Sequence, residues 1–597
     1  MTVTPPRVPP PDGRGDTARR ETPAPPTVPP ARTAPAPSPE EGAGRARDSR
    51  SFLARAALVT AALSVAGALL GLARDQALAR LFGAGGDTDA FLVAWTVPEF
   101  AATLLIEDGL AFLLVPAFSV ALARRARGVP GDPVRALVAA TVPRLLLALV
   151  GGAALVVALA PYLVAVLAPG LPDPALAVDC TRLTATCVLT FGLAGYCSAA
   201  LRAHRRFLAP AAIYVAYNTA IITAMLLLGG RWGVRSAAAG VAAGGCLMIA
   251  VQLPSLVRRL GARSAMKAET AEVADAPEGA ETADAPEVAE APEGAPARGA
   301  PTDGARPVAM LLVVTVLLFA LCRQSQVLVE RYLASQLPAG AISHLNYAQK
   351  VAQIPMTLSL MLCTVTFPVV ARALADGDTE GARARVERDL ALAACVVLLG
   401  TAAVVSCGPQ IVEVLFQRGA FTAADTAATA RVMRVYALGL LAQTLVGTLI
   451  RSYFSAGRPT WYPVAAMFLG IVVTSWAGAW AVDPWGTAGI AAANAAGITL
   501  TAALLLAGTR RRGMVPVRVR RVLLEVSRPL GAALAATAAG AYAASLPAGP
   551  VVSLAAGLLA VTVVFVLLGR ALHAQGVAPA LRSVRSVTRK LAHGRFP

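Results

Sequence analysis

The sequence predicts an all-α polytopic membrane protein of about fourteen transmembrane helices, arranged in two lobes around a polar cavity. Composition is the first observation: 56% of the 597 residues are hydrophobic and 15% are charged. The mean hydropathy of +0.62 is typical of a bilayer protein. Apolar segments of about 20 residues, the length that crosses the hydrocarbon core, recur from Ser51 to Leu572. Basic residues gather in alternate loops, as expected for a chain that crosses a membrane repeatedly.

The first fifty residues differ from the rest of the chain. Residues 1–50 are rich in Pro, Ala, Arg and Thr and contain no apolar core of a secretory signal peptide. We interpret them as a disordered cytoplasmic tail.

Apolar runs bounded by loops place the membrane spans. We expect them at residues 52–72, 89–122, 136–168, 179–201, 207–229, 235–257, 308–336, 341–371, 389–416, 425–453, 460–481, 487–508, 527–546 and 549–571.

The net charge of +18 is explained by where the basic residues lie. Arginines cluster in loops that all fall on one side of the predicted topology, at 124–127, 202–206, 258–263, 383–388 and 510–521. The intervening loops carry few, and Arg74, Arg80, Arg231 and Arg418 are the exceptions. This asymmetry predicts a multi-pass plasma-membrane protein with both termini in the cytoplasm. Nucleic acid is not needed as a partner to explain the charge.

Cysteines and histidines give no sign of a metal or cofactor. The eight cysteines form no C-x-x-C pair and lie almost entirely within predicted spans, which is typical of small buried apolar residues. The four histidines are scattered. We therefore expect no metal site and no cofactor.

An acidic segment divides the predicted helices into two sets. Residues 261–307 are rich in Ala, Pro and acids, and from Glu269 to Glu293 an acidic residue recurs at every third position. Prolines inside the segment favour a solvated, partly polyproline-like cytoplasmic linker, either a passive spacer or a docking motif. We accordingly expect a first lobe at 51–260, a second lobe at 308–508, two further spans within 509–572, and a basic cytoplasmic tail at 573–597.

Ionisable residues at bilayer depth are the best internal sign of function, because an unpaired charge there costs several kcal/mol or more. They concentrate in the first, second, seventh and eighth expected spans. The candidate substrate-binding residues are Arg74, Asp75, Asp89, Glu99, Glu107, Arg323, Glu330, Arg331, Gln349 and Lys350.

Each candidate has a structural alternative. Arg74 and Asp75 can form a structural pair near the outer interface, and Arg80 fits an interfacial residue that reaches toward the headgroups. Adjacent helical residues point about 100° apart, so Glu330 and Arg331 each need a partner elsewhere. We expect Lys350 to face the cavity rather than the interface.

The motifs around these residues resemble the MurJ/MviN lipid II flippases of the multidrug/oligosaccharidyl-lipid/polysaccharide exporter superfamily. The first half of the resemblance lies in Arg74-Asp75, Arg80 to Gly85, Thr88 to Phe91, Val97-Pro98, Glu107 and Val115-Pro116. The second half lies in Glu330-Arg331, Leu333 to Ser335, Ser343 to Lys350, Pro355, Leu415 to Thr422 and Asp425-Thr426. It runs from about Ser51 to Gly508.

The resemblance implies fourteen helices in two lobes that form a V-shaped, cationic central cavity. It implies alternating-access transport of the undecaprenyl-pyrophosphate-linked peptidoglycan precursor. Arg74 and Lys350 would bind the pyrophosphate from opposite lobes. Asp89 and Glu107 would order those cations or take part in ion coupling, and residues 527–571 would hold the prenyl tail.

Five positions depart from the family pattern. The family usually has an arginine where this chain has Ala68 and an arginine pair where it has Ala102-Thr103. It usually has asparagine at the position of Glu99 and aspartate at that of Gln349.

A lipid II flippase is therefore the predicted function, with lipid-linked precursor, membrane lipids and cell-wall synthesis proteins as partners. Two alternatives stay open: an exporter of another polyprenyl-linked saccharide or of a small cation, and a non-transporting membrane scaffold for cell-wall assembly. We expect no enzyme, because the sequence contains no Walker-A loop, nucleophile elbow or H-E-x-x-H motif. Energy would come from an ion gradient or the membrane potential.

Overall fold

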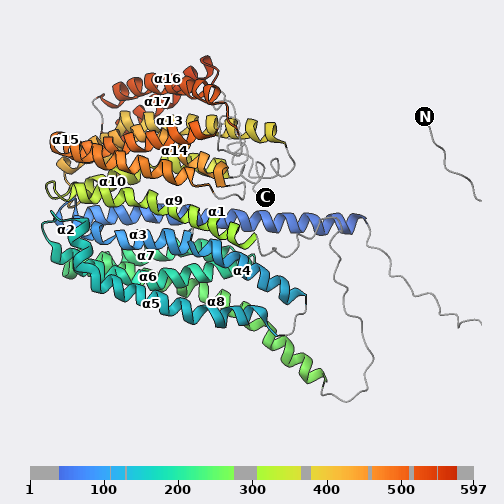
Figure 1. The fold of residues 1–597 in the computed structure, drawn as a ribbon. Helices are drawn as coiled ribbons and strands as arrows, with labels where there is room; N and C mark the ends of the chain where they lie inside the picture. Colours follow the sequence, from blue (N-terminus) through green and yellow to red (C-terminus); the bar gives the residue numbers. More distant parts are fainter. Residues whose placement is uncertain are drawn as a thin grey trace, which may run out of the picture. The chain divides into compact units, whose positions relative to one another are not determined.

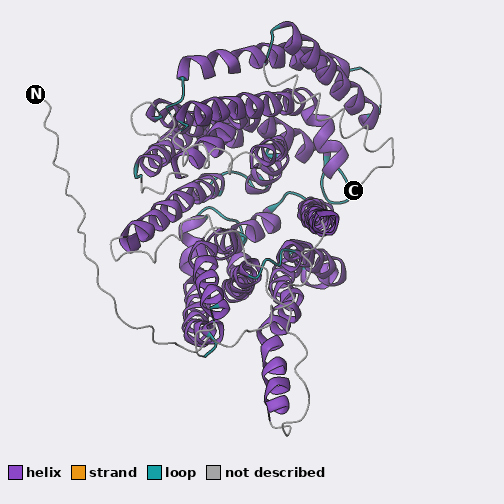
Figure 2. Cartoon of the chain, turned by 90° about the vertical axis from the view of Figure 1, so that its right-hand side faces the viewer, coloured by secondary structure: helices purple, strands orange, loops and turns teal. Residues whose placement is uncertain are grey.

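A computed structural model describes residues 39–574, apart from residues 108, 128–130, 275–304, 365–377, 455–459, 510–515 and 547–548. Helices make up almost all of this part of the chain, and no strand occurs among the described residues (Figures 1 and 2). We refer to the helices before and after residues 275–304 as the first and second halves.

Described from the N-terminal side, the first half contains three α-helices, a π-helix and five further α-helices. They are α1 Pro39–Phe82, α2 Gly86–Ala94, α3 Thr96–Ala101, the π-helix Ala102–Glu107, α4 Gly109–Ala126, α5 Pro133–Leu167, α6 Pro174–Ala203, α7 Leu208–Trp232 and α8 Arg235–Ala274.

The second half continues with longer helices. Its described helices are α9 Ala305–Ala334, α10 Ala341–Ala352, α11 Ile354–Thr364, α13 Thr379–Phe416, α14 Ala423–Phe454, α15 Tyr462–Gly508, α16 Val519–Ala544 and α17 Pro550–Ala571.

The all-helical membrane class is confirmed. Within the described residues, ten helical segments are long and apolar enough to cross a membrane. The expected spans 460–481 and 487–508 run together as α15, which kinks at Gly486, where φ is +56°. The full count of fourteen and the V-shaped arrangement stay predictions.

The expected span 89–122 is not one regular helix. It breaks after Trp95, contains Pro98 in α3, and continues as a π-helix before α4. Proline removes a backbone donor, and a π-turn carries an extra residue per turn, so both re-aim the side chains that follow. The π-helix also lies very close to α6: a Cβ on Gly195 would be 1.9 Å from the Leu105 carbonyl oxygen. Glycine at 195 therefore makes this packing possible.

Two helices extend beyond the expected boundaries. α1 begins at Pro39, inside the segment interpreted as a disordered tail, and Glu40 and Glu41 follow in its first turn. Proline at the start and acids in the first turn both favour a helix N-terminus. α8 runs to Ala274, past the expected linker start at 261, and ends before Pro277. Residues 1–38, most of the acidic segment and residues 575–597 lie outside the described part.

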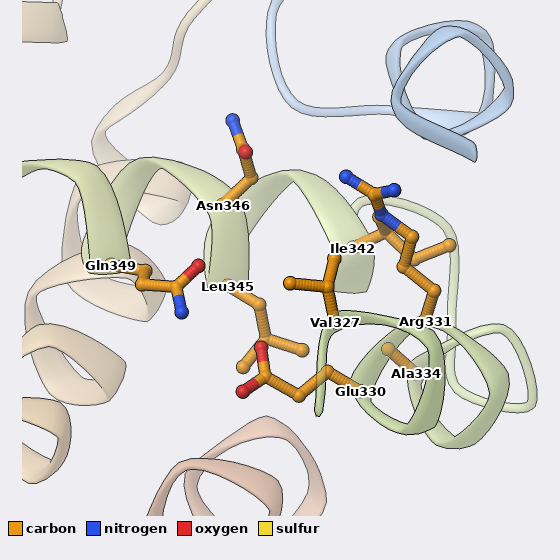
Figure 3. A pocket seen from close by; sticks show the side chains of 8 residues that line it. All are labelled: Val327, Glu330, Arg331, Ala334, Ile342, Leu345, Asn346 and Gln349. Atoms are coloured by element: carbon orange, nitrogen blue, oxygen red, sulfur yellow. The ribbon is translucent and has the colours of Figure 1, made fainter. Parts of the chain in front are cut away.

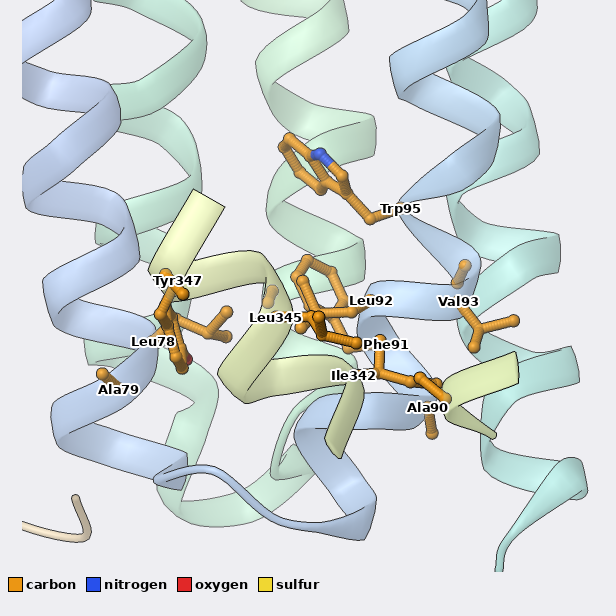
Figure 4. Close-up of a cluster of buried hydrophobic side chains, with 14 of the residues drawn as sticks. Leu78, Ala79, Ala90, Phe91, Leu92, Val93, Trp95, Ile342, Leu345 and Tyr347 are labelled. Atoms are coloured by element: carbon orange, nitrogen blue, oxygen red, sulfur yellow. The ribbon is translucent and has the colours of Figure 1, made fainter. Parts of the chain in front are cut away.

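The largest buried cluster contains residues of both halves. Phe91 and Trp95 of the first half belong to the same cluster as Leu345 and Tyr347 of α10 (Figure 4). A separate cluster joins α13, α16 and α17 around Phe565. The first cluster therefore lies beside the polar residues predicted from the sequence.

Candidate functional site

Three short turns meet next to this core, and we call them the turn cluster: residues 80–89, 335–343 and 416–422. A glycine with positive φ lies in each turn: Gly83 (+68°), Gly340 (+96°) and Gly419 (+65°). Side chains at these positions would strike backbone oxygens of a neighbouring turn, because a Cβ on Gly340 would lie 2.6 Å from the Ala84 oxygen. The Ala420 N–H also donates to the Arg80 carbonyl at 2.9 Å. Glycine thus permits the close backbone contact between the halves.

Asp89 is the buried acid of the turn cluster. Its carboxylate accepts hydrogen bonds from the backbone N–H of Gly340 at 2.6 Å and of Ser343 at 2.7 Å, and from the Ser343 hydroxyl at 2.5 Å. These donors lie at the N-terminus of α10, where the helix dipole favours an anion. Asp89, from α2, therefore joins the first half to the start of α10.

Arg74 is held from three sides within the first half. Its guanidinium donates to Asp75 at 2.7 Å and to the Asn218 side-chain oxygen at 3.2 Å. It also lies 4.4 Å from the ring centre of Trp95, a cation–π distance. The structural pairing considered for Arg74 and Asp75 is present, and both side chains are nearly buried.

Glu99 lies between the halves and contacts two cations of the second half. Its carboxylate is 3.0 Å from Arg331 Nη2 and 4.0 Å from Lys350 Nζ. Arg331 also donates to the Thr96 hydroxyl. Arg331 is almost fully buried, whereas the Lys350 side chain is 33% exposed. Glu99 also lies within electrostatic range of Arg74, so three cations surround one acid.

Glu330 and Arg331 use different partners, as their adjacent positions require. Glu330 accepts a hydrogen bond from the Tyr436 hydroxyl at 2.7 Å and another from the Asn494 amide, so it is held inside the second half. Figure 3 shows the two side chains diverging from α9 at a small pocket. Gln349 of α10 lines the same pocket.

The two remaining candidates lie apart from this cluster. Glu107 accepts a hydrogen bond from the Tyr214 hydroxyl at 3.0 Å. Arg323 is exposed and makes no hydrogen bond or ion pair with any described residue. The structure therefore gathers Arg74, Asp75, Glu99, Arg331 and Lys350 around one region.

Sequence reasoning missed the uncharged partners of these residues. Trp95, Asn218, Tyr436 and Asn494 hold the buried charges in place. A polar side chain in the middle of an apolar span was the available signal for Asn218 and Asn494, because a buried amide needs partners.

The His, Cys, Asp and Glu side chains in the described part of the chain are the possible ligands of a metal site. Among the described residues, no group of three His, Cys, Asp or Glu side chains gathers at metal-binding distance. The seven cysteines whose side chains are described are free. The chemistry available here is ion pairing and hydrogen bonding.

Apolar helices long enough to cross a membrane, with charged side chains paired between two halves, are the arrangement of a multi-pass membrane transporter. The chain belongs to the family described as Lipid II flippase MurJ, whose model matches residues 78–559. A Lipid II flippase MurJ of Burkholderia cenocepacia is 26% identical over 469 residues, covering 77% of this chain and 84% of that protein. A probable lipid II flippase MurJ of Treponema pallidum is 22% identical over 412 residues, covering 68% and 72%.

Solved structures agree on the fold. A structure of lipid II flippase MurJ in an inward closed conformation matches with a TM-score of 0.65 at 17% identity, covering 86% of this chain and 98% of that one. An inward-facing multidrug resistance MATE transporter of the MOP superfamily matches with a TM-score of 0.55 at 13% identity, covering 78% and 99%. The resemblance seen in the motifs is thus confirmed.

Proposed function

We propose that this chain flips lipid II, the undecaprenyl-pyrophosphate-linked peptidoglycan precursor, across the plasma membrane by alternating access. Family membership over residues 78–559 supports the substrate class. The observation that carries the mechanism is the convergence of Arg331 and Lys350 from the second half on Glu99 of the first. Fixed cations at bilayer depth replace the hydration of a pyrophosphate.

The orientation follows from the distribution of basic residues. With both termini in the cytoplasm, α1 runs outward and the turn cluster faces the outside. Asp89 then holds the outer side shut through its hydrogen bonds to Gly340 and Ser343. Opening toward the outside has to break those bonds, so the Asp89 contacts set the balance between the two states.

The carboxylates keep the cations charged and oriented while no substrate is bound. Glu99 forms ion pairs with Arg331 and Lys350, and Asp75 forms one with Arg74. A pyrophosphate carries more negative charge than one carboxylate and competes for the same guanidinium and ammonium donors. The pyrophosphate separates Lys350 from Glu99 first, because their 4.0 Å contact is long and the Lys350 side chain is partly exposed. Substrate binding thereby loosens one of the ties between the halves.

Transport also needs an energy source, a place for the prenyl tail and partner proteins. The membrane potential supplies about 2.3 kcal/mol per charge per 100 mV, and movement of the charged pyrophosphate or of a coupled ion would use it. After Arg528, α16 and α17 contain a single charged residue, Arg570, and this apolar part is proposed to hold the prenyl tail. Cell-wall synthesis proteins are the proposed partners outside the membrane-spanning part.

A second candidate is favoured by one observation. Ala68, Ala102 and Thr103 stand where the family usually has arginines, and Glu99 stands where it usually has asparagine. These changes of the cavity cations favour an exporter of another substrate, either a different polyprenyl-linked saccharide or a small cation, as the second candidate.

Depletion of the cell's own lipid II flippase tests the proposal. Expression of this chain in depleted cells should restore lipid II in the outer leaflet, measured by its accessibility to an externally added degrading enzyme. Failure to restore it, with normal expression and membrane insertion, would favour the other exporter or a non-transporting scaffold.

A further inference from the structure

A cavity of about 420 Å³ lies beside the Arg74 site and has no assigned role. It lies between α1, the last turn of α6 and the beginning of α7. Its wall includes Ser64 and Ala68 of α1, Arg202 of α6, and Tyr214 and Asn218 of α7. Asn218 also accepts a hydrogen bond from Arg74, so the cavity adjoins the cation cluster.

Arg202 is the cation of this cavity. Its side chain is partly buried and makes no hydrogen bond or ion pair with any described residue. Arg74 and Arg331, in contrast, each pair with a carboxylate. A partly buried guanidinium without an anionic partner presents its donors to a ligand, and its planar fork matches phosphate oxygens.

Glu107 lies beside this wall, but its carboxylate does not pair with Arg202. Glu107 accepts a hydrogen bond from the Tyr214 hydroxyl at 3.0 Å and forms no ion pair with Arg202. Tyr214 itself lies within electrostatic range of Arg202. The guanidinium thus keeps its positive charge uncompensated at the cavity wall.

Position 68 lacks a cation that Arg202 can replace. The chain has alanine where the resembled family usually has an arginine, and this alanine is exposed on the wall that contains Arg202. We infer that Arg202 supplies the missing cation from α6 and forms a binding site for the diphosphate of a polyprenyl-linked lipid. This inference rests on the proposed flippase function.

The position of the cavity along α1 indicates when in the transport cycle Arg202 binds the substrate. Residues 68 and 74 are separated by about 9 Å of helix rise. In the proposed orientation, α1 runs outward, so Arg202 lies nearer the cytoplasm than Arg74. Arg202 binds the diphosphate first, and Arg74 and Lys350 bind it after it has moved outward along α1.

Binding of a polyprenyl diphosphate to the full chain in phosphatidylcholine nanodiscs tests the site. Arg202→Ala should weaken this binding by about tenfold or more, as expected for the loss of charge-assisted hydrogen bonds. Ala68→Arg, added to Arg202→Ala, should restore most of it. Arg206→Ala removes a charge from the same loop but not from the cavity wall, and should leave binding unchanged.

Three results separate the inference from the proposed function. Equal binding by Arg202→Ala and the unchanged chain would overturn the Arg202 site and leave the flippase proposal standing. Absence of binding by the unchanged chain would overturn the flippase proposal itself. Competition by phosphatidylglycerol as strong as that by the diphosphate would show a general anionic-lipid site, which contradicts the assignment.

Folding of the variants is checked in the same preparations. If Arg202→Ala lowers the thermal unfolding temperature, Arg202→Gln keeps most of the side chain and replaces it in the comparison. Weakened binding by a stable Arg202→Gln variant supports the site, and unchanged binding overturns it.

Discussion

The Glu99 carboxylate lies 3.0 Å from Arg331 Nη2 and joins α3 of the first half to α9 of the second. The Arg331 side chain is almost completely buried, so removal of Glu99 leaves a buried guanidinium charge without its carboxylate partner. Loss of one member of such a pair costs about 3–5 kcal/mol.

Double-mutant cycles should therefore rank the two contacts of Glu99. We expect the coupling energy of Glu99 with Arg331 to exceed that of Glu99 with Lys350, because the second contact is 4.0 Å long and partly exposed. Thermal unfolding of Glu99→Gln, Arg331→Gln, Lys350→Gln and the double variants in detergent measures both values. Equal couplings would contradict the ranking.

Asp89 provides a prediction for the turn cluster. Asp89→Asn should speed hydrogen exchange of the Gly340 and Ser343 amides by about tenfold or more, because a hydrogen bond to a charged acceptor contributes about 1.5–3 kcal/mol. Mass spectrometry of the exchanged protein measures the rates. Asp87→Asn is the matched control, since Asp87 is exposed two residues earlier. Unchanged exchange in Asp89→Asn would show that Asp89 does not hold the turn.

Gly340 tests the backbone contact between the halves. Gly340→Ala should destabilise the protein by about 1–3 kcal/mol, because alanine is strained at a φ of +96° and its Cβ would lie 2.6 Å from the Ala84 oxygen. The unfolding temperature in detergent measures the change. Gly85→Ala should be nearly neutral, since Gly85 has an extended backbone and open space around its Cβ position. A similar loss in both variants would mean that the contact is not the cause.

Tyr436 tests whether Glu330 has a structural role. Tyr436→Phe removes one hydrogen bond from a buried carboxylate and should cost about 1.5–3 kcal/mol of stability. Tyr542→Phe is a suitable control because Tyr542 is 73% exposed. Chemical unfolding in detergent compares them. Full stability of Tyr436→Phe would place Glu330 outside the structural core of the second half.

The sequence predicted the helical class and several of the charged residues that the structure brings together, because both depend on simple free-energy costs. Apolar spans need about 20 residues, and charges at bilayer depth need partners. Arg74, Glu99, Arg331 and Lys350 were found for that reason, before any partner was known.

Pairing could not be predicted, because it depends on how helices distant in the sequence face each other. Nothing in the sequence joins Glu99 to Arg331, or Asp89 to the start of α10. The same holds for the π-helix, which reflects close packing of its backbone on Gly195. Asn218 and Asn494 carry no charge, so the cost of a charge at bilayer depth does not single them out.

Transport is proposed to depend on the cavity cations, so their loss should stop transport without preventing membrane insertion of the protein. Arg74→Ala and Lys350→Ala should each reduce lipid II flipping at least tenfold, since both cations are proposed to bind the pyrophosphate. Arg231→Ala, which changes an exposed arginine at the end of α7, should flip normally.

Lipid II flipping by purified protein in proteoliposomes, with a membrane potential applied, is the most direct measurement. We expect flipping by the unchanged chain and by Arg231→Ala, and little or none by Arg74→Ala and Lys350→Ala. Normal flipping by both cavity variants, or none by the unchanged chain, would contradict this expectation.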